Sequence, residues 1–241
     1  MGFAFVTAIY SIREEYSEQL IERFNVLLEV LPTDCPIFVW SDLSLPAFSH
    51  PGVRQLNTPL SDFEVYRLGT DPALRLPPIR SPEKDTAEYM SLMNAKMEML
   101  LKVVPHLPPD VETLAWVDCG VSKIWKDVER VRQTIHRVSR GKLANPNQMV
   151  VPGCWPARYP PHNHIYWRFC GGFFLVSVSF IQTLYNLFLK VYKRMLEQER
   201  VILWELNVWT TLEYWYPSAI HWFLGDHDES LFEVPQELLL Q

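Results

Sequence analysis

Asp118 is a lone carboxylate at the end of the short apolar run TLAWV, residues 113–117, and Cys119 and Gly120 follow it. The run is typical of a buried β-strand. In an open α/β sheet, ligands bind beyond the carboxyl ends of the strands. A carboxylate there can hold a hard cation or a ribose hydroxyl, and Gly120 lets the backbone pass close to a ligand. The other interpretation is that Asp118 caps the helix that follows.

Glu205 lies inside the apolar stretch VILWELNVWTTLEYW, residues 201–215, which predicts a buried helix. A carboxylate in such a helix must be paired, be protonated or face a cleft. Glu205 is therefore the best candidate for a general base. Gly171 and Gly172 precede a strand-like run, and two glycines admit a ligand without obstruction by a Cβ atom. A bulge or a tight turn explains the two glycines equally well.

His227 falls in the polar cluster GDHDE, residues 225–229. Neutral imidazole ligates metals, whereas an exposed histidine in a turn is the simpler interpretation.

The chain has four cysteines: Cys35, Cys119, Cys154 and Cys170. They are scattered and form no Cys-x-x-Cys pair, so the spacing predicts neither a zinc framework nor a disulfide scaffold. We expect reduced and mostly buried thiols.

The elements that must position these residues alternate between strands and helices. Apolar runs predict strands at 3–9, 36–40, 113–117, 171–179 and 219–224. Helical periodicity predicts helices at 13–31, 85–104, 126–139, from the fourth strand to about 199, and 202–215. This order favours an α/β fold with a mixed, largely parallel sheet covered on both faces. We expect one domain over residues 1–241, with irregular proline-rich loops near 41–82 and 144–163.

Composition excludes several classes of protein. The net charge of −6 and the pI near 5.7 argue against a partner that is a nucleic acid polymer. An anionic ligand would therefore need a local cation. No apolar run approaches the roughly 20 residues of a transmembrane segment, and no basic leader opens the sequence, so we expect a cytoplasmic protein. The nine glycines form neither a Gly-x-Gly-x-x-Gly motif nor a P-loop.

Six short stretches resemble, in order, the HtrL/YibB (WlaTC-like) family of glycosyltransferases. They are FVTAIYSI with Arg13, YMSLMNAKMEMLLKV, AWVDCGV, RFCGGFFLVS, WELNVWTTLE and GDHD, and they extend from about residue 4 to 228. The resemblance implies a single-domain, three-layer GT-A-like fold and a nucleotide-diphosphate sugar as donor. It implies a carbohydrate or a lipid-linked glycan as acceptor, and a divalent cation, Mn or Mg, that bridges the diphosphate.

In the GT-A-like fold, an Asp-x-Asp motif ends a central strand. The stretch DCG aligns Asp118 with the first acid but has Gly120 in place of the second. A Mn or Mg ion held by Asp118 would then need His227 or Asp226, together with diphosphate oxygens and water.

Alternatively, the reaction uses no metal and basic side chains neutralise the diphosphate. The candidates are Arg13, Lys96 and Arg168. The sequence leaves both possibilities open.

The resemblance also assigns roles. Glu205 would be the base that deprotonates the acceptor hydroxyl in a direct inverting displacement, and Asp118 would share the catalytic site. The expected donor-binding residues are Thr7, Arg13, Lys96, Asp118, Gly120, Gly171 and Gly172. Two other functions compete with this one. A metal-dependent phosphoester hydrolase would use Asp118 and His227, and a non-catalytic carbohydrate-binding module would use some of the nine tryptophans.

Overall fold

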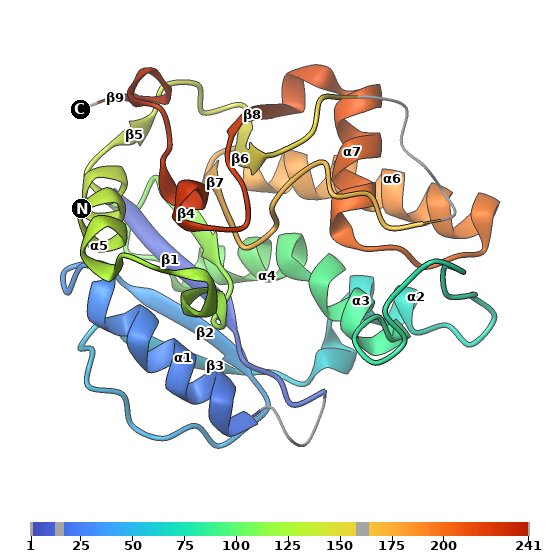
Figure 1. The fold of residues 1–241 in the computed structure, drawn as a ribbon, viewed down its shortest axis with the longest axis horizontal. Helices are drawn as coiled ribbons and strands as arrows, with labels where there is room; N and C mark the ends of the chain where they lie inside the picture. The colour runs from blue at the N-terminus through green and yellow to red at the C-terminus, as the bar shows by residue number, and fades with distance from the viewer. Residues whose placement is uncertain (1, 13–16, 158–163, 241) are drawn as a thin grey trace.

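The computed structural model describes residues 2–12, 17–157 and 164–240. Its main sheet has seven strands in the order β3-β2-β1-β4-β7-β6-β8 (Figure 1). Their bounds are β1 Phe3–Ala8, β2 Ile37–Ser41, β3 Val53–Asn57, β4 Thr113–Val117, β6 Met149–Gly153, β7 Phe173–Ser177 and β8 Ile220–Leu224. The short strands β5 (Lys142–Leu143) and β9 (Leu239–Leu240) form a second, antiparallel pair.

The main sheet is mixed and mostly parallel, as the alternation of elements predicts. Strands β3, β2, β1 and β4 pair in parallel, as do β6 and β8. Strand β7 runs antiparallel to both of its neighbours, β4 and β6. Its start therefore meets the edge of the sheet at which β4 ends.

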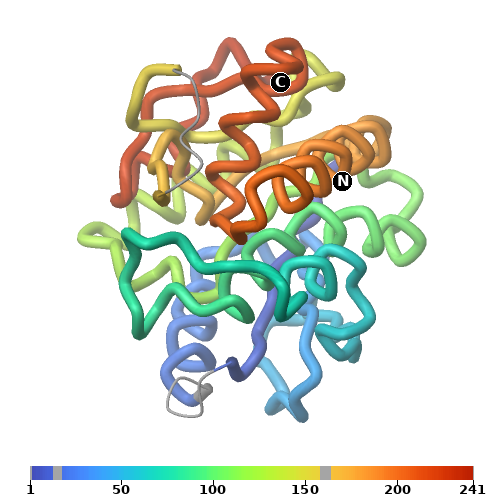
Figure 2. Tube along the Cα trace, turned by 90° about the vertical axis from the view of Figure 1, so that its right-hand side faces the viewer, coloured from blue at the N-terminus to red at the C-terminus, as the bar shows by residue number. Residues whose placement is uncertain are grey.

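Helices cover both faces of the sheet. Their bounds are α1 Ser17–Val30, α2 Glu64–Gly69, α3 Ala87–Asn94, α4 Lys96–Val103, α5 Val128–Ser139, α6 Ile181–Glu199 and α7 Glu205–Trp215. Helices α1 and α5 share one core cluster, and α3, α4, α6 and α7 share the other. Figure 2, turned by 90° from Figure 1, brings α6 and α7 to the viewer's side. The expected single domain over residues 1–241 stays a prediction.

Successive side chains of a strand point to opposite faces of the sheet, and this alternation explains the two core clusters. In β4, Leu114 and Trp116 point into one cluster, while Ala115 and Val117 point into the other. All five residues of this strand are buried. A strand buried on both faces needs a continuous apolar run, and this run is what made β4 visible in the sequence.

The two proline-rich stretches hold more regular structure than the sequence predicts. Residues 41–82 contain β3 and α2, and residues 144–163 contain β6. Strand β3 lies at the sheet edge, is only partly buried and carries polar residues, so it has no apolar run. Pro152 lies inside β6, and a proline normally argues against an interior strand.

The helix expected at 85–104 is divided into α3 and α4, which meet at Ala95. This division makes Lys96 the first residue of α4. None of the helices in the described ranges is both long and apolar enough to cross a lipid bilayer.

Candidate active site

The backbone brings Asp118 close to Gly171 and Gly172, the glycine pair. Asp118 directly follows β4, and Gly172 directly precedes the antiparallel β7. The amide of Asp118 donates a hydrogen bond to the carbonyl oxygen of Gly172 over 2.9 Å. The reversed direction of β7 therefore places the glycine pair at the carboxyl end of β4, where α/β sheets bind ligands.

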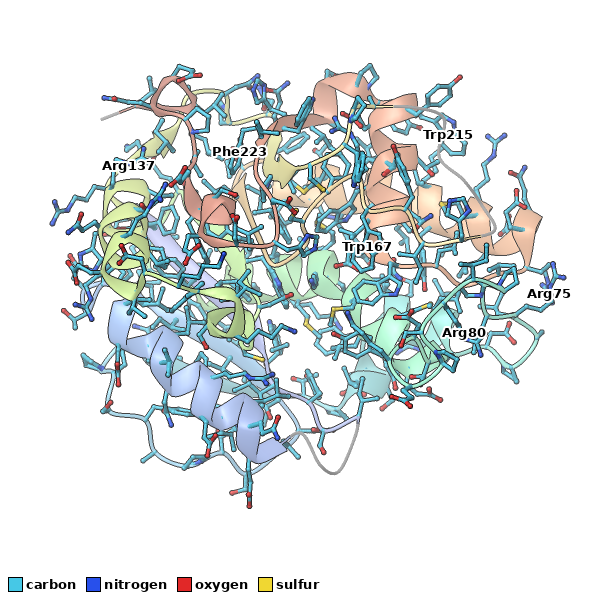
Figure 3. All side chains as sticks on the ribbon, in the orientation of Figure 1. Arg75, Arg80, Arg137, Trp167, Trp215 and Phe223 are labelled. Atoms are coloured by element: carbon cyan, nitrogen blue, oxygen red, sulfur yellow. The ribbon has the colours of Figure 1, made fainter. Side chains whose placement is uncertain are left out.

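A cavity of about 340 Å³ opens at this edge of the sheet. It has the mainly apolar lining and the few converging polar groups of a small-molecule site. Five aromatic side chains line it: Tyr10, Tyr89, Trp116, Trp167 and Trp204. Trp167 is labelled in Figure 3. Three cations line it as well: Arg23, Lys84 and Lys123.

Lys96, a predicted donor-binding residue, is not among the lining residues but contacts three residues that are. Its side chain is 1% exposed, and its ammonium nitrogen Nζ donates to three acceptors. These are Asp118 Oδ1 at 3.0 Å, Glu205 Oε1 at 2.9 Å and the Gly171 carbonyl oxygen at 2.9 Å. Burial lowers the pKa of Lys96, but the two carboxylates more than offset it and raise the pKa above its ordinary value. Lys96 is therefore a fixed positive charge at neutral pH.

Asp118 is the exposed member of this network, with a side chain that is 35% exposed. Besides Lys96, its Oδ1 accepts a hydrogen bond from the Trp116 indole nitrogen over 2.7 Å. These two donors fix the carboxylate while leaving it in contact with the cavity.

Glu205 is the first residue of α7 and is 1% exposed. Its Oε1 is bonded to Lys96, and its Oε2 has no hydrogen-bond partner among the described residues. Burial raises the pKa of Glu205, although Lys96 opposes the change. A Cβ atom on Gly171 would lie 2.4 Å from Oε1, so only glycine leaves room for the carboxylate in this place.

The structure thus places most of the predicted site residues around one cavity. The lining includes Asp118, Gly120, Gly171, Gly172, Glu205 and His227. Whether these residues bind a donor stays a prediction.

Other predicted residues lie elsewhere. Thr7 is fully buried inside β1, outside the cavity lining, and its Oγ1 has no hydrogen-bond partner in the described ranges. Arg168 is also fully buried and forms an ion pair of 2.9 Å with Glu213. Arg13 lies outside the described residues.

The donor set around Asp118 does not fit a Mn or Mg ion. The Oδ1 of Asp118 already accepts from Lys96 and Trp116, which leaves only its Oδ2 for a metal, and the neighbouring charge is already positive. A Cβ atom on Gly120 would face Leu20 at 3.4 Å and the Arg23 Cδ at 3.9 Å. The place of the second acid of an Asp-x-Asp motif therefore lies beside a cation.

His227 lies beside a thiol and a carboxylate. Its Nδ1 is 3.7 Å from the Cys170 Sγ and 3.3 Å from the Asp226 Oδ1. In the described part of the chain, one trio of Cys, His, Asp or Glu side chains has its ligand atoms within 4.8 Å of one another, and it consists of Cys154, Cys170 and Asp226.

The four cysteines are free, and all but the half-buried Cys154 are buried. The expectation that the thiols are mostly buried is therefore confirmed, and their reduced state stays a prediction. The proximity of two of them was not visible in the sequence, because it depends on how the strands pair.

Sequence reasoning missed the three cations of the lining. Arg23 lies on α1, Lys84 lies in the loop before α3, and Lys123 follows Gly120 closely. None of them stands in a motif, so no local signal distinguishes them from other surface cations.

A larger and more open hollow of about 730 Å³ lies beside α5. Arg132, His136 and Arg137 are among its lining residues. Its lining includes no residue of the main sheet and none of the buried carboxylates, so the smaller cavity is the better candidate for a site of chemistry.

No protein-family model matches this sequence, and no curated protein matches it. The apo crystal structure of mouse xyloside xylosyltransferase 1 is similar over 92% of this chain and 85% of that chain, with a TM-score of 0.51 and 10% identity. 4-Diphosphocytidyl-2C-methyl-D-erythritol synthase from Anaerococcus prevotii DSM 20548 aligns over 98% of this chain and 94% of that chain, with a TM-score of 0.42 and 9% identity. At these identities the similarity is one of fold. The chain has a GT-A-like fold with a mixed, mostly parallel sheet.

Proposed function

We propose that this protein is a glycosyltransferase of the HtrL/YibB (WlaTC-like) family. It moves a sugar from a nucleotide-diphosphate donor to a hydroxyl group of a carbohydrate or lipid-linked glycan acceptor. One observation carries the proposal. At the carboxyl end of β4, the half-exposed Asp118 faces a cavity lined by aromatic side chains and three cations. The similarity in fold to a xylosyltransferase supports it.

The lining suits both halves of such a donor. The half-buried Trp167 offers a stacking surface for a nucleobase or a sugar, and the buried Tyr10 and Trp204 line the cavity beside it. Arg23 and Lys123 offer charge-assisted hydrogen bonds to a diphosphate. Gly120 and Gly172 allow the donor to approach the backbone closely. Gly171, beside which Glu205 takes up the space of a Cβ, stays a predicted donor neighbour, as do Thr7 and Arg13.

The proposed reaction is a direct displacement with inversion. The acceptor oxygen attacks the anomeric carbon, and its proton passes to Glu205. The diphosphate leaves with the bonding electron pair and is stabilised by the cations. The buried Oε2 of Glu205 lacks a partner among the described residues, which an acceptor hydroxyl would supply. The raised pKa makes Glu205 a stronger base than an ordinary glutamate.

Lys96 positions the two carboxylates and does not contact the donor in this proposal. Its three hydrogen bonds hold Asp118 and Glu205 at a fixed separation. Because the donor set does not fit Mn or Mg, no step is assigned to either ion. Arg23, Lys84 and Lys123 supply the charge that the Asp-x-Asp metal supplies in other GT-A-like enzymes.

Calorimetric titration with a panel of nucleotide sugars and free nucleoside diphosphates tests the proposal, followed by turnover assays with mixed glycan acceptors. Asp118→Asn should lower turnover by about 10²–10³-fold while the fold is retained. The exposed Asp42→Asn is the matched control and should behave as the wild-type protein.

Three results contradict the proposal. The wild-type protein binding no donor and no nucleoside diphosphate removes its basis. Glycan binding without turnover in either form indicates a carbohydrate-binding module. Turnover of simple phosphoesters that depends on Asp118 indicates a hydrolase.

A further inference from the structure

Four metal-ligating side chains from three separate segments converge at the rim of the cavity. Cys154 follows β6, Cys170 lies shortly before β7, and Asp226 and His227 follow β8. The ligand atoms of Cys154, Cys170 and Asp226 lie within 4.8 Å of one another. His227 contacts two members of this trio through its Nδ1.

Backbone pairing explains why these segments meet. Strand β6 lies between β7 and β8 in the sheet. Beyond the strands, the Cys170 amide donates to the Pro152 carbonyl oxygen over 2.9 Å. The Cys154 amide donates to the Arg168 carbonyl oxygen over 3.2 Å, and the Gly225 amide donates to the Gly153 carbonyl oxygen over 3.1 Å. The ligands are therefore held in place by the sheet and its extensions.

Two of the separations match those of a tetrahedral site. Zinc binds sulfur at about 2.3 Å and nitrogen or oxygen at about 2.0–2.2 Å, so tetrahedral neighbours lie about 3.3–3.8 Å apart. The His227 Nδ1 is 3.7 Å from the Cys170 Sγ and 3.3 Å from the Asp226 Oδ1. Both distances fall in this range. His227 is not part of the trio whose ligand atoms all lie within 4.8 Å of one another, so side-chain rotation must complete the tetrahedron.

We propose that Cys154, Cys170, Asp226 and His227 bind one zinc ion. Two thiolates, one imidazole and one carboxylate are ligands that zinc accepts, whereas Mg and Mn prefer oxygen donors only. The four protein ligands fill a tetrahedron and leave no open position for water, which is typical of a structural zinc site. The zinc site does not include Asp118, and it does not depend on the proposed sugar transfer.

The bound zinc would order one wall of the cavity. Cys170 directly precedes Gly171, whose carbonyl oxygen is bonded to Lys96. The His227 ring lies edge-on to Trp167, with 5.7 Å between the ring centroids. The metal would therefore link three parts of the cavity wall, namely the glycine pair, Trp167 and the segment after β8.

Binding of one Zn²⁺ ion must release the two thiol protons, because zinc binds cysteine as thiolate. Calorimetric titration of the metal-free, reduced protein with zinc in two buffers of different ionisation enthalpy measures this release. The wild-type protein should release close to two protons per zinc.

Metal analysis of the full chain, purified without chelators from zinc-supplemented cells, gives the first test. We expect one zinc per chain in the wild-type protein and less than a tenth of that in Cys154→Ser and Cys170→Ser. The buried Cys35→Ser and the exposed His221→Asn are matched controls and should keep the metal.

Cobalt substitution in the wild-type protein provides a second readout that needs no variant. A tetrahedral site with two thiolates gives a sulfur-to-cobalt charge-transfer band in the near ultraviolet and intense visible d–d bands. Asp226→Asn changes an exposed side chain and should fold normally, while weakening zinc binding by about tenfold or more.

Two results overturn the proposal. The first is wild-type protein that is purified without zinc, with Cys154 and Cys170 either as thiols or joined by a disulfide, and that gives no cobalt spectrum after reduction. The second is zinc that stays at full occupancy when both of these cysteines are replaced by serine.

Discussion

The Lys96 ammonium lies 2.9 Å from the Glu205 Oε1, and the two side chains are 1% and 2% exposed. The same ammonium lies 3.0 Å from the Asp118 Oδ1, on the side of the cavity. One buried cation thus holds a buried and an exposed carboxylate at the same time. A buried charge whose partner is removed becomes strongly unfavourable, so each member of this trio depends on the others.

Lys96→Met should lower the free energy of unfolding by about 3–5 kcal/mol, because Glu205 then stays buried without a counter-charge. The double variant Lys96→Met/Glu205→Gln should regain part of this loss. Lys193→Met is the control, because Lys193 forms a 2.7 Å pair with Glu64 at the surface and should change stability by at most about 1 kcal/mol. Urea unfolding measures the free energy of unfolding of these three variants. A loss as small as that of Lys193→Met would contradict the role of Lys96.

The stability of Lys96→Met should also depend on pH. Burial raises the pKa of Glu205, and removal of Lys96 raises it further. A group with a raised pKa in the folded state favours folding when it is protonated, and this contribution disappears as the pH rises through that pKa. The difference in free energy of unfolding between Lys96→Met and the wild-type protein should therefore become smaller towards acid pH. A difference that grows there would contradict the prediction.

The two adjacent glycines should tolerate alanine differently. A Cβ atom on Gly171 would lie 2.4 Å from the Glu205 Oε1 and 3.1 Å from the Leu206 Cδ2, and Glu205 is held by Lys96. Gly171→Ala should therefore destabilise the protein by about 1–3 kcal/mol. At Gly172 the nearest atom lies at 3.6 Å, an ordinary contact, so Gly172→Ala should fold with nearly unchanged stability. Thermal unfolding of the pair measures this difference, and equal stability of the two variants would exclude the crowding at Gly171.

The pH dependence of turnover should report Glu205. If Glu205 is the base, kcat/KM falls as the pH falls through the pKa of Glu205, which gives the pH profile an acid limb. Because burial raises this pKa, the acid limb should lie above the ordinary glutamate value of about 4.3. Glu205→Gln should reduce kcat by about 10²–10⁴-fold and remove the limb from the residual activity. An unchanged limb in Glu205→Gln would assign the base to another group.

Arg23 and Lys123 should bind the diphosphate of the donor. A hydrogen bond to a charged group contributes about 1.5–3 kcal/mol, so each change to alanine should weaken nucleoside diphosphate binding by about tenfold or more. Lys190→Ala on α6, outside the cavity lining, is the control. Added Mn or Mg should not strengthen binding in the wild-type protein, because the acid position of the metal motif is Gly120. A strong gain with either ion would show that the cations are not the neutralising groups.

The sequence predicts the central strands well because they are buried on both faces and therefore apolar throughout. The central strands β1, β4 and β7 all lie within the expected runs. It misses β6, because Pro152 interrupts the run, and β3, because an edge strand needs no apolar run. An apolar run in the sequence indicates a buried segment. Strands β3 and β6 form mainly because they pair with neighbouring strands, and the sequence pattern does not show this pairing.

The same limit applies to the site. Asp118 and Glu205 were identifiable because a carboxylate beside or within an apolar run needs an explanation. Arg23 and Lys84 were not, because an isolated cation on a helix or in a loop is ordinary. The Cys154–Cys170 pair was hidden, because its proximity follows from the pairing around β6 and not from spacing along the chain.

The ion pair between Lys96 and Glu205 joins residues that are 109 positions apart. A growing chain therefore exposes Lys96 and Asp118 long before α7 leaves the ribosome, and the pocket cannot be completed until most of the polypeptide has been synthesised. A contact of such sequence separation closes a long loop at an entropic cost, as the pairing of Phe3 in β1 with Thr113 in β4 also does. A nascent chain that ends before α7 lacks Glu205 and therefore cannot complete the pocket.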